Sequence, residues 1–384
     1  RVGTLSGNRS TTALAARQLR SMAHQAGLVD VLGSAAAGLG VQGFTDTLGF
    51  GDVQHAVICL LDGLGWRLLQ EHGEHAPTLT AAPGRSIDSV FPTTTPSALG
   101  SIGTGLLPGA HGLVGASFYL PETEQVLSPL HWDKATSPIA VQPEPTIFEV
   151  VARQGVVVSS IGPAAYGESG LTRAVLRGAQ YRPAEDIAQR VRALQSATSG
   201  AGRTLTYVYW AQIDRVGHAS GVGSKAWLEA VRRADDLVAG LQAILPQDSA
   251  MLVTADHGMV NCPPSSRIAI ESHPDLVADV LTIAGEPRVR HVYARPMHVA
   301  DVAIRWATRL GDRVRVFTRD EILAEGLYGP TDDLLAVRIG DVVAVAQGST
   351  SLTSRRDTRV SSLIGQHGAL TAAEREIPAV MFRG

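Results

Sequence analysis

The sequence predicts an α/β fold, in which a doubly wound, mostly parallel sheet is accompanied by a smaller α+β lobe. Continuous apolar runs of strand length recur along the chain, and turn residues or segments with helical spacing follow them. Strands that are buried on both faces of a parallel sheet have this continuous apolar pattern, and their alternation with helices indicates βαβ units. Beyond about residue 262 the elements become shorter, which indicates a separate lobe.

The first 27 residues are rich in Ala, Ser, Thr and Arg, and we expect a peripheral extension with a helix-compatible stretch over 11–25. Residues 28–261 and 361–384 are predicted to form the α/β core, and 262–360 the inserted lobe. The predicted core strands lie in HAVICLLD, SIDSVF, VVVSSIG, TLTYVYWAQ and AMLVTAD, and the predicted core helices lie in GWRLLQEHG, PAEDIAQRVRALQ and KAWLEAVRRADDLVAGLQAIL. The lobe is predicted to contain a helix in DVAIRWATRL, a strand in RVRVFT, and an antiparallel pair formed by LLAVRIG and DVVAVAQG.

Composition limits the function classes. With 33 basic and 36 acidic residues among 384, a net charge of −3 and no long run of either sign, the sequence shows no basic area for nucleic acid or anionic membranes. No apolar stretch approaches the roughly 20 residues that span a bilayer. Two cysteines cannot form a disulfide framework, so the cytoplasm is the expected location. Because the chain begins at Arg1, a processed export signal is the alternative.

Polar residues follow several of the predicted strands. Ligands of open α/β sheets bind outside the carboxyl ends of the strands. Asp62 ends HAVICLLD, Asp214 and His218 follow TLTYVYWAQ, and Asp256 and His257 end AMLVTADH. Taken singly, such carboxylates are ordinary helix caps or turn residues. Asp214 and His218, however, are four residues apart, so on a helix they would share one face and could bind one ion.

As a set, these residues indicate a metal centre. His367, in LIGQHGAL, adds a third imidazole, although a lone His is more often structural. Asp and His are ligands that Zn²⁺ favours, and six of them with a Thr oxygen suffice for two sites that each keep a position for substrate. No cysteine is among the candidates. Because structural zinc sites usually contain Cys, the set indicates catalytic ions.

Thr95 is the candidate nucleophile in FPTTTPSALGSIGTG. A Thr hydroxyl is a poor nucleophile until a base or a metal lowers its pKa. The segment after it is helix-compatible, so Thr95 would lie near a helix N-terminus that favours a phosphate anion. The alternative is an ordinary Thr-rich turn that caps a helix.

Five segments between residues 57 and 369 resemble the type I phosphodiesterase and nucleotide pyrophosphatase family of the alkaline phosphatase superfamily. In order, they are VICLLDGLGW, FPTTTPSALGSIGTGLLPGAHGLVG, AQIDRVGHASG, VTADHGMV and GQHGAL. The resemblance implies an alkaline phosphatase-like fold, two divalent ions, zinc or alternatively manganese, and phosphoester hydrolysis through a covalent phospho-Thr intermediate. It implies that one ion is bound by Asp214, His218 and His367, and the other by Asp62, Asp256, His257 and the Thr95 oxygen.

Among the three threonines, Thr95 keeps the family's ungapped spacing to Thr104 and Gly105. The resemblance therefore implies that Thr95 is the nucleophile, and Thr94 is the alternative if this spacing slips by one residue. Pro96 and Ala116 stand where nucleotide pyrophosphatases usually have a base-stacking aromatic residue and a phosphate-binding Asn. Nucleotide specificity is therefore not implied.

No Arg lies beside Thr95 to bind the extra oxygens of a monoester, as in true alkaline phosphatases, and the sulfatase nucleophile motif is absent. We therefore expect a small-molecule phosphodiester as substrate. Phosphomonoester or phosphonate hydrolysis, and a non-hydrolytic metal-binding protein, are the alternatives. Candidate substrate-lining residues are Tyr166, in the loop GPAAYGESG, and Tyr119, Trp132 and Trp210, each of which could instead fill ordinary packing contacts. The sequence does not indicate an oligomeric state.

Overall fold

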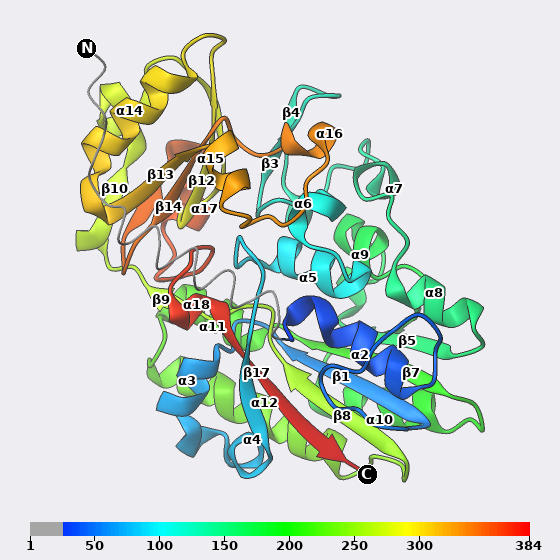
Figure 1. Cartoon of the computed structure of the whole chain (residues 1–384). Helices are drawn as coiled ribbons and strands as arrows, with labels where there is room; N and C mark the ends of the chain where they lie inside the picture. Colours follow the sequence, from blue (N-terminus) through cyan, green and yellow to red (C-terminus); the bar gives the residue numbers. More distant parts are fainter. Residues whose placement is uncertain (1–25) are drawn as a thin grey trace.

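The computed structural model describes residues 26–384 and contains a seven-stranded main sheet (Figure 1). From one edge to the other, the strands are β2 (Gly84–Asp88), β17 (Glu376–Arg383), β8 (Ser249–Thr254), β1 (His55–Leu61), β7 (Thr204–Trp210), β5 (Val157–Gly162) and β6 (Gln180–Pro183). The five strands from β8 to β6 are parallel, whereas β17 is antiparallel to both β8 and β2. The parallel strands therefore end at a common edge of the sheet, where a ligand site is expected.

Helices cover the two faces of this sheet, so the predicted fold class is confirmed. One layer contains α2 (Val31–Gly38), α5 (Thr95–Thr104), α8 (Ile147–Arg153) and α9 (Gly170–Val175). The other contains α3 (Trp66–Glu71), α4 (Pro77–Ala81), α10 (Ile187–Thr198), α11 (Gln212–Ser220) and α12 (Lys225–Gln242). Strands β1 and β8 are buried along their whole length, as their continuous apolar sequences require.

A second, four-stranded sheet lies in the segment predicted as the lobe. Its order is β11 (Val280–Glu286), β12 (Val289–Ala294), β14 (Val342–Ala346) and β13 (Val314–Thr318), and all its pairs are antiparallel. Helix α14 (Val299–Leu310) packs on it through the fully buried Trp306 and a core separate from that of the main sheet. The exact lobe boundaries remain a prediction.

Shorter elements complete the described chain. The helices are α6 (Pro108–His111), α7 (Pro138–Val141), α13 (Pro274–Val277), α15 (Arg319–Ala324), α16 (Asp333–Ala336), α17 (Thr358–Ser361) and α18 (Ala372–Arg375). The strand pairs are β3 (Phe118–Leu120) with β4 (Gln125–Leu127), β9 (Val260–Asn261) with β16 (Gly365–Gln366), and β10 (Arg267–Ala269) with β15 (Ser351–Thr353). The 3₁₀ helices are η1 (Leu28–Asp30), η2 (Gly73–His75), η3 (Pro129–His131), η4 (Ala164–Tyr166), η5 (Pro264–Ser266), η6 (Ile270–Ser272), η7 (Gly311–Arg313) and η8 (Arg355–Asp357).

One predicted strand is wrong. The segment LLAVRIG contains no strand. Its first three residues belong to the short helix α16, which Asp332 caps by accepting a hydrogen bond from the backbone N–H of Leu334 at 2.8 Å, and the remaining four lie in turns and irregular chain. The partner predicted for it, β14, pairs with β12 and β13. The extension predicted over residues 1–27, with its helix-compatible stretch, lies outside the described residues apart from its last two positions.

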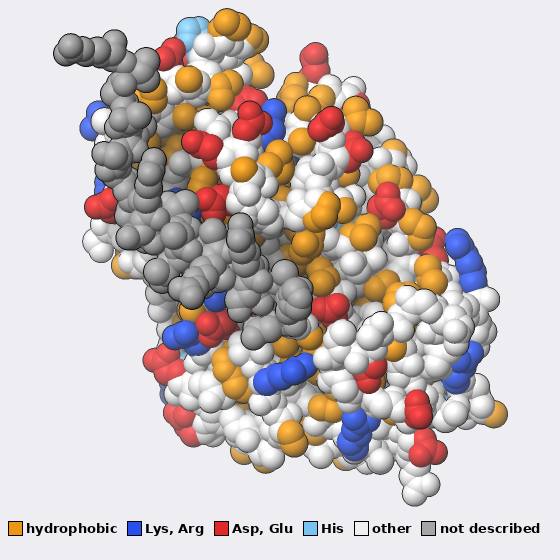
Figure 2. Space-filling model, viewed as in Figure 1, with side chains coloured by type: hydrophobic (Ala, Val, Ile, Leu, Met, Phe, Trp, Pro, Cys, Tyr) orange, Lys and Arg blue, Asp and Glu red, His pale blue; other side chains and the backbone are white. Residues whose placement is uncertain are grey.

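Charged side chains of both signs lie on the face of the molecule drawn in Figure 2. On the face drawn in Figure 2, Lys and Arg side chains are scattered among acidic and apolar ones, without forming a continuous basic area. Among residues 26–384, no helix is both long enough and apolar enough to cross a membrane.

Candidate metal centre

The first group of candidate ligands lies where two neighbouring parallel strands end. Asp62 follows β1 directly, and Asp256 and His257 follow β8. The Nε2 atom of His257 lies 3.3 Å from Oδ2 of Asp256 and 3.7 Å from Oδ1 of Asp62. All three side chains are buried, and their donor atoms are close enough together to bind one ion.

The second group combines helix α11 with the C-terminal part of the chain. Asp214 and His218 lie one turn apart on α11, as the spacing predicted, and Oδ1 of Asp214 is 3.3 Å from Nε2 of His218. His367 follows β16, and its Nε2 atom lies 3.6 Å from the same Asp214 oxygen and 3.2 Å from Nε2 of His218. The three side chains therefore converge on one point.

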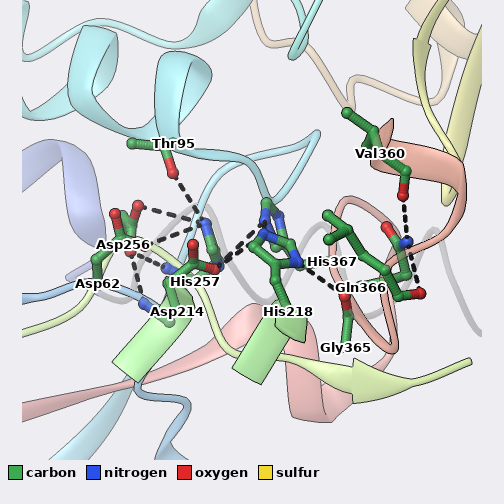
Figure 3. A network of polar contacts seen from close by, with 12 residues as sticks. Asp62, Thr95, Asp214, His218, Asp256, His257, Val360, Gly365, Gln366 and His367 are labelled. Carbon is green, nitrogen blue, oxygen red and sulfur yellow. Dashed lines mark hydrogen bonds and ion pairs between the residues drawn. The ribbon is translucent and has the colours of Figure 1, made fainter. Parts of the chain in front are cut away.

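The two groups are adjacent (Figure 3). The rings of His257 and His367 are stacked with their centroids 3.6 Å apart, so the donors of both groups face one cluster. Asp214, His257 and His367 also lie within reach of a shared ion. The structure thus brings all six Asp and His residues named by the sequence to one place.

Thr95 is the first residue of α5, and Thr94 precedes it in an extended conformation as the N-cap. The Oγ1 atom of Thr95 lies 3.2 Å from Nε2 of His257. The neighbouring hydroxyls have other partners: Thr93 donates to the carbonyl of Ala369 at 2.9 Å, and the Thr94 hydroxyl faces the carboxyl of Glu286. Of these three threonines, Thr95 is therefore the one whose hydroxyl lies against the candidate ligands.

The donor set fits cations. Asp62, Asp214 and Asp256 each have one buried carboxylate oxygen without a hydrogen-bond partner among the described residues. Burying a carboxylate oxygen without a partner is costly, and a bound cation would remove this cost. The facing Nε2 atoms of His218 and His367 likewise need a cation or a proton between them. The residues present therefore fit two divalent ions.

The histidine rings are oriented for binding through Nε2. The Nδ1 atoms of His218, His257 and His367 lie 2.7, 3.0 and 2.9 Å from the carbonyl oxygens of Gly365, Gly258 and Thr93, respectively. A carbonyl oxygen can only accept, so each Nδ1 carries the proton and each Nε2 is free to coordinate a metal. Such contacts fix the tautomer and the ring orientation in metal sites.

Without a cation, the buried charges perturb one another. Burial raises the pKa of Asp62 well above its usual value, and the neighbouring Asp256 and Asp214 raise it further. Burial also raises the pKa of Asp214, against the effect of His218. The pKa of His367 is lowered by burial and then by His257 and His218. A divalent cation would favour the charged carboxylates and the neutral imidazoles.

Tyr209 is a site residue that the sequence analysis did not identify. Its hydroxyl donates a hydrogen bond to Oδ2 of Asp62 (the oxygen opposite the unpartnered Oδ1) and so orients the carboxylate. Tyr209 is the penultimate residue of β7, and the parallel register places Leu61 of β1 beside Trp210. An aromatic hydroxyl near the end of a predicted strand was the available signal, but the strand order was needed to interpret it.

The candidate substrate-lining residues are dispersed. Tyr166, in η4, is 42% exposed, and its ring lies 5.9 Å from that of Tyr209, which places it at the edge of the centre. Trp210 is buried beneath Arg190, whose guanidinium lies 4.8 Å from its ring. Tyr119 packs against Tyr293.

Trp132 was also a candidate, and its Nε1–H donates to the carbonyl of Thr136 at 2.9 Å. Tyr166 is thus the candidate that the structure places next to a ligand-contacting residue.

Comparison with known proteins gives the family and related folds. A family model described as type I phosphodiesterase / nucleotide pyrophosphatase matches residues 56–370. Murine ectonucleotide pyrophosphatase / phosphodiesterase 5 is similar in structure, with a TM-score of 0.70 and 19% identity over 86% of this chain and 88% of that one. Phosphonoacetate hydrolase from Sinorhizobium meliloti 1021, in complex with phosphonoformate, gives a TM-score of 0.66 and 19% identity over 87% and 91% of the two chains.

An inactive form of the murine protein has been solved in complex with AMP, and it matches with a TM-score of 0.70 and 19% identity over 85% of this chain and 87% of that one. A search of curated proteins gave no match. At these identities the solved structures establish the fold, whereas the family model covers most of the chain. The chain therefore belongs to the type I phosphodiesterase / nucleotide pyrophosphatase family and is a metal-dependent hydrolase of that family.

Proposed function

We propose that the chain is a two-metal phosphodiesterase that uses Thr95 as its nucleophile. The observation that carries this proposal is the position of the Thr95 hydroxyl, 3.2 Å from Nε2 of His257 and at the start of α5. A phosphoryl group in front of this helix would meet its free N–H groups and the positive end of its dipole. The same hydroxyl would then be in position to attack phosphorus.

We assign one ion to Asp214, His218 and His367, and the other to Asp62, Asp256, His257 and Thr95. The unpartnered carboxylate oxygens and the three Nδ1–carbonyl contacts support this assignment. Zinc is the metal we favour, because the donors are imidazoles and carboxylates, with manganese as the alternative. A reducing, cytoplasmic location remains our expectation, and both cysteines are buried and free.

When bound, the two ions would lower the pKa of the Thr95 hydroxyl and stabilise the charge on the phosphoryl oxygens. The Thr95 oxygen then forms a bond to phosphorus while the opposite bond, to the leaving-group oxygen, breaks. The product is a phospho-Thr intermediate and an alcohol or phosphate leaving group. Attack by water on the phosphorus of this intermediate releases the second product and regenerates Thr95.

The substrate class follows from what surrounds the nucleophile. Pro96, which follows Thr95 directly, cannot stack on a base as an aromatic residue would, and no Arg is adjacent to Thr95 in the sequence to bind a third phosphate oxygen. We therefore favour a diester, with Tyr166 as the side chain that contacts the leaving group. The AMP and phosphonoformate complexes of the structural neighbours keep nucleotides and phosphonates as the alternative substrates.

The test compares bis(p-nitrophenyl) phosphate, p-nitrophenyl phosphate and phosphonoacetate as substrates of the metal-loaded enzyme. We expect the diester to be hydrolysed with the highest kcat/KM, activity to disappear after chelation, and zinc or manganese to restore it. A strong preference for the monoester or the phosphonate would refute the diesterase assignment. Fewer than one equivalent of metal by elemental analysis would refute the metal centre.

A further inference from the structure

A buried ion pair joins the lobe to the C-terminal segment of the core. Arg288, which precedes β12, binds Glu374 of α18 in a bidentate manner, with Nη2–Oε2 and Nε–Oε1 distances of 2.8 and 2.9 Å. Both side chains are completely buried. Burying two charges is expensive unless their geometry and remaining hydrogen bonds are good, so a pair of this kind requires an explanation beyond simple stability.

Glu374 contacts the two turns that carry the central histidines. Its Oε1 atom accepts a hydrogen bond at 3.0 Å from the backbone N–H of Ala369, two residues after His367. Its carbonyl oxygen accepts one at 2.8 Å from the N–H of Gly258, the residue after His257. The side chain therefore orients one histidine turn, and the backbone of the same residue supports the other.

We propose that the Arg288–Glu374 pair is a positioning device through which the lobe fixes the ring of His367 for metal binding. This inference rests on the proposed metal centre. The two hydrogen bonds from Arg288 hold both oxygens of the Glu374 carboxylate and so orient its Oε1 atom toward the N–H of Ala369. Without Arg288 the buried carboxylate loses its counter-charge and keeps, besides Ala369, only the Thr371 hydroxyl, 2.6 Å from Oε2, so it is free to reorient away from the turn after His367.

The effect is specific to one ion. The side chain of Glu374 bonds the turn of His367, whereas the contact to Gly258 is made by its backbone and survives substitution. Loss of the pair therefore weakens the ion of Asp214, His218 and His367 and spares the ion of Asp62, Asp256 and His257. A pair with a purely structural role would weaken both ions together or neither.

The chain offers a matched control two residues away. Arg290, within β12, is as buried as Arg288 and pairs with Asp357, and it also donates to the carbonyl of Leu352 at 2.7 and 2.9 Å. All these partners belong to the lobe segment and none contacts a candidate ligand turn. Replacing Arg290 therefore breaks a buried pair without removing a hydrogen bond to either histidine turn.

The experiment measures zinc binding by competition with a chromogenic chelator in the full-length wild type and in Arg288→Met, Glu374→Leu, the double variant and Arg290→Met. We expect the wild type to bind two ions. Replacing either member of the Arg288–Glu374 pair is expected to weaken the affinity for one ion by roughly 10- to 100-fold, whereas Arg290→Met is expected to keep the wild-type affinity. Urea unfolding of the same proteins separates stability from binding. The double variant is expected to recover stability, since no charge is left unpaired, but not affinity.

Two tight ions in Arg288→Met, or equal losses in Arg290→Met, would overturn the positioning role while leaving the metal centre intact. Fewer than one ion in the wild type would overturn the proposed function instead. If Arg288→Met does not fold, Arg288→Lys takes its place. Lysine cannot bind both oxygens of Glu374 in the same planar geometry, so weaker binding of one ion is again expected, and wild-type affinity would refute the proposal.

Discussion

Thr95 and His257 are 162 residues apart in the sequence, yet Oγ1 of the first lies 3.2 Å from Nε2 of the second. The helix that begins at Thr95 and the strand that ends before His257 meet at the carboxyl edge of the main sheet. The hydroxyl and the imidazole therefore point toward the same candidate ion. This relationship makes the nucleophile assignment testable by single substitutions.

Replacing Thr95 with Ala is expected to reduce kcat by roughly three orders of magnitude or more while leaving most of the metal bound, because six Asp and His ligands remain. Thr94→Ala is the control, since it removes the neighbouring hydroxyl and tests the alternative register. We expect Thr94→Ala to keep most of its activity. Measuring turnover and metal content in both variants tests these expectations. Unchanged turnover in Thr95→Ala would contradict the assignment of Thr95 as the nucleophile.

The positions of the acidic candidates could be predicted from the sequence because parallel strands end at one edge. Asp62 and Asp256 each follow a continuous apolar run of strand length, and Asp214 and His218 have the spacing of one helical face. The position of His367 could not be predicted in this way. It follows a strand of only two residues, so the resemblance to the family, and no local pattern, indicated it.

What the sequence could not predict depends on long-range pairing. The main sheet includes the edge strand β6 and the antiparallel strand β17, neither of which we predicted. Strand β17 lies between β8 and β2 and pairs with both. The segment after Asp332 has the apolar pattern of a short strand, but a local cap starts a short helix there, and turns follow it. The Arg288–Glu374 pair joins residues 86 positions apart, and no sequence period relates them.

Tyr209→Phe is expected to weaken the binding of the ion at Asp62 by about 10- to 100-fold, because the carboxylate loses the hydroxyl that orients it. Tyr207→Phe is the matched control on the same strand. The Tyr207 hydroxyl is buried and has no hydrogen-bond partner among the described residues, so its removal is expected to leave the affinity unchanged and the stability equal or higher. Competition titrations with zinc test both expectations, and equal affinities in the two variants would contradict the role of Tyr209.

The buried carboxyl of Glu286 is expected to make the free energy of unfolding depend on pH. Burial raises the pKa of its carboxyl to about 8 from the ordinary Glu value of 4.5, against the opposing effects of Thr94 and Arg290. Between these two pH values the folded chain keeps a proton that the unfolded chain releases, so this contribution to stability is present below pH 4.5 and is lost as the pH rises through 8. At about 1.4 kcal/mol per pKa unit, it is on the order of 4–5 kcal/mol.

The uncharged Glu286→Gln carries no such proton. We therefore expect the variant to gain stability relative to the wild type as the pH rises from 5 to 8.5. Urea unfolding with a chelator present measures the free energy of unfolding of both proteins across this range. Parallel pH profiles for the variant and the wild type would show that Glu286 does not retain its proton in the folded state.

Gly63 packs closely against Asp214, a candidate ligand of the other metal site. It follows Asp62 with a φ of +80°, and a Cβ atom at this position would lie 2.8 Å from the Cα and Cβ atoms of Asp214. Gly49 has a similar φ of +85° but nothing within 4 Å of its Cβ position. Both Gly→Ala changes are thus expected to cost roughly 1–2 kcal/mol of stability for the left-handed backbone. Only Gly63→Ala also displaces Asp214.

Gly63→Ala is therefore expected to lose zinc affinity and turnover, whereas Gly49→Ala keeps both and loses only the stability that the backbone strain costs. Urea unfolding gives the stability of each variant, and zinc titration with turnover of the diester gives its function. The comparison separates two effects of one added methyl group, because backbone strain is common to both positions and the contact with Asp214 is unique to one. Full affinity for two ions in Gly63→Ala would mean that α11 can shift without moving its ligands out of reach. The close approach of Gly63 to Asp214 would then not be needed for metal binding.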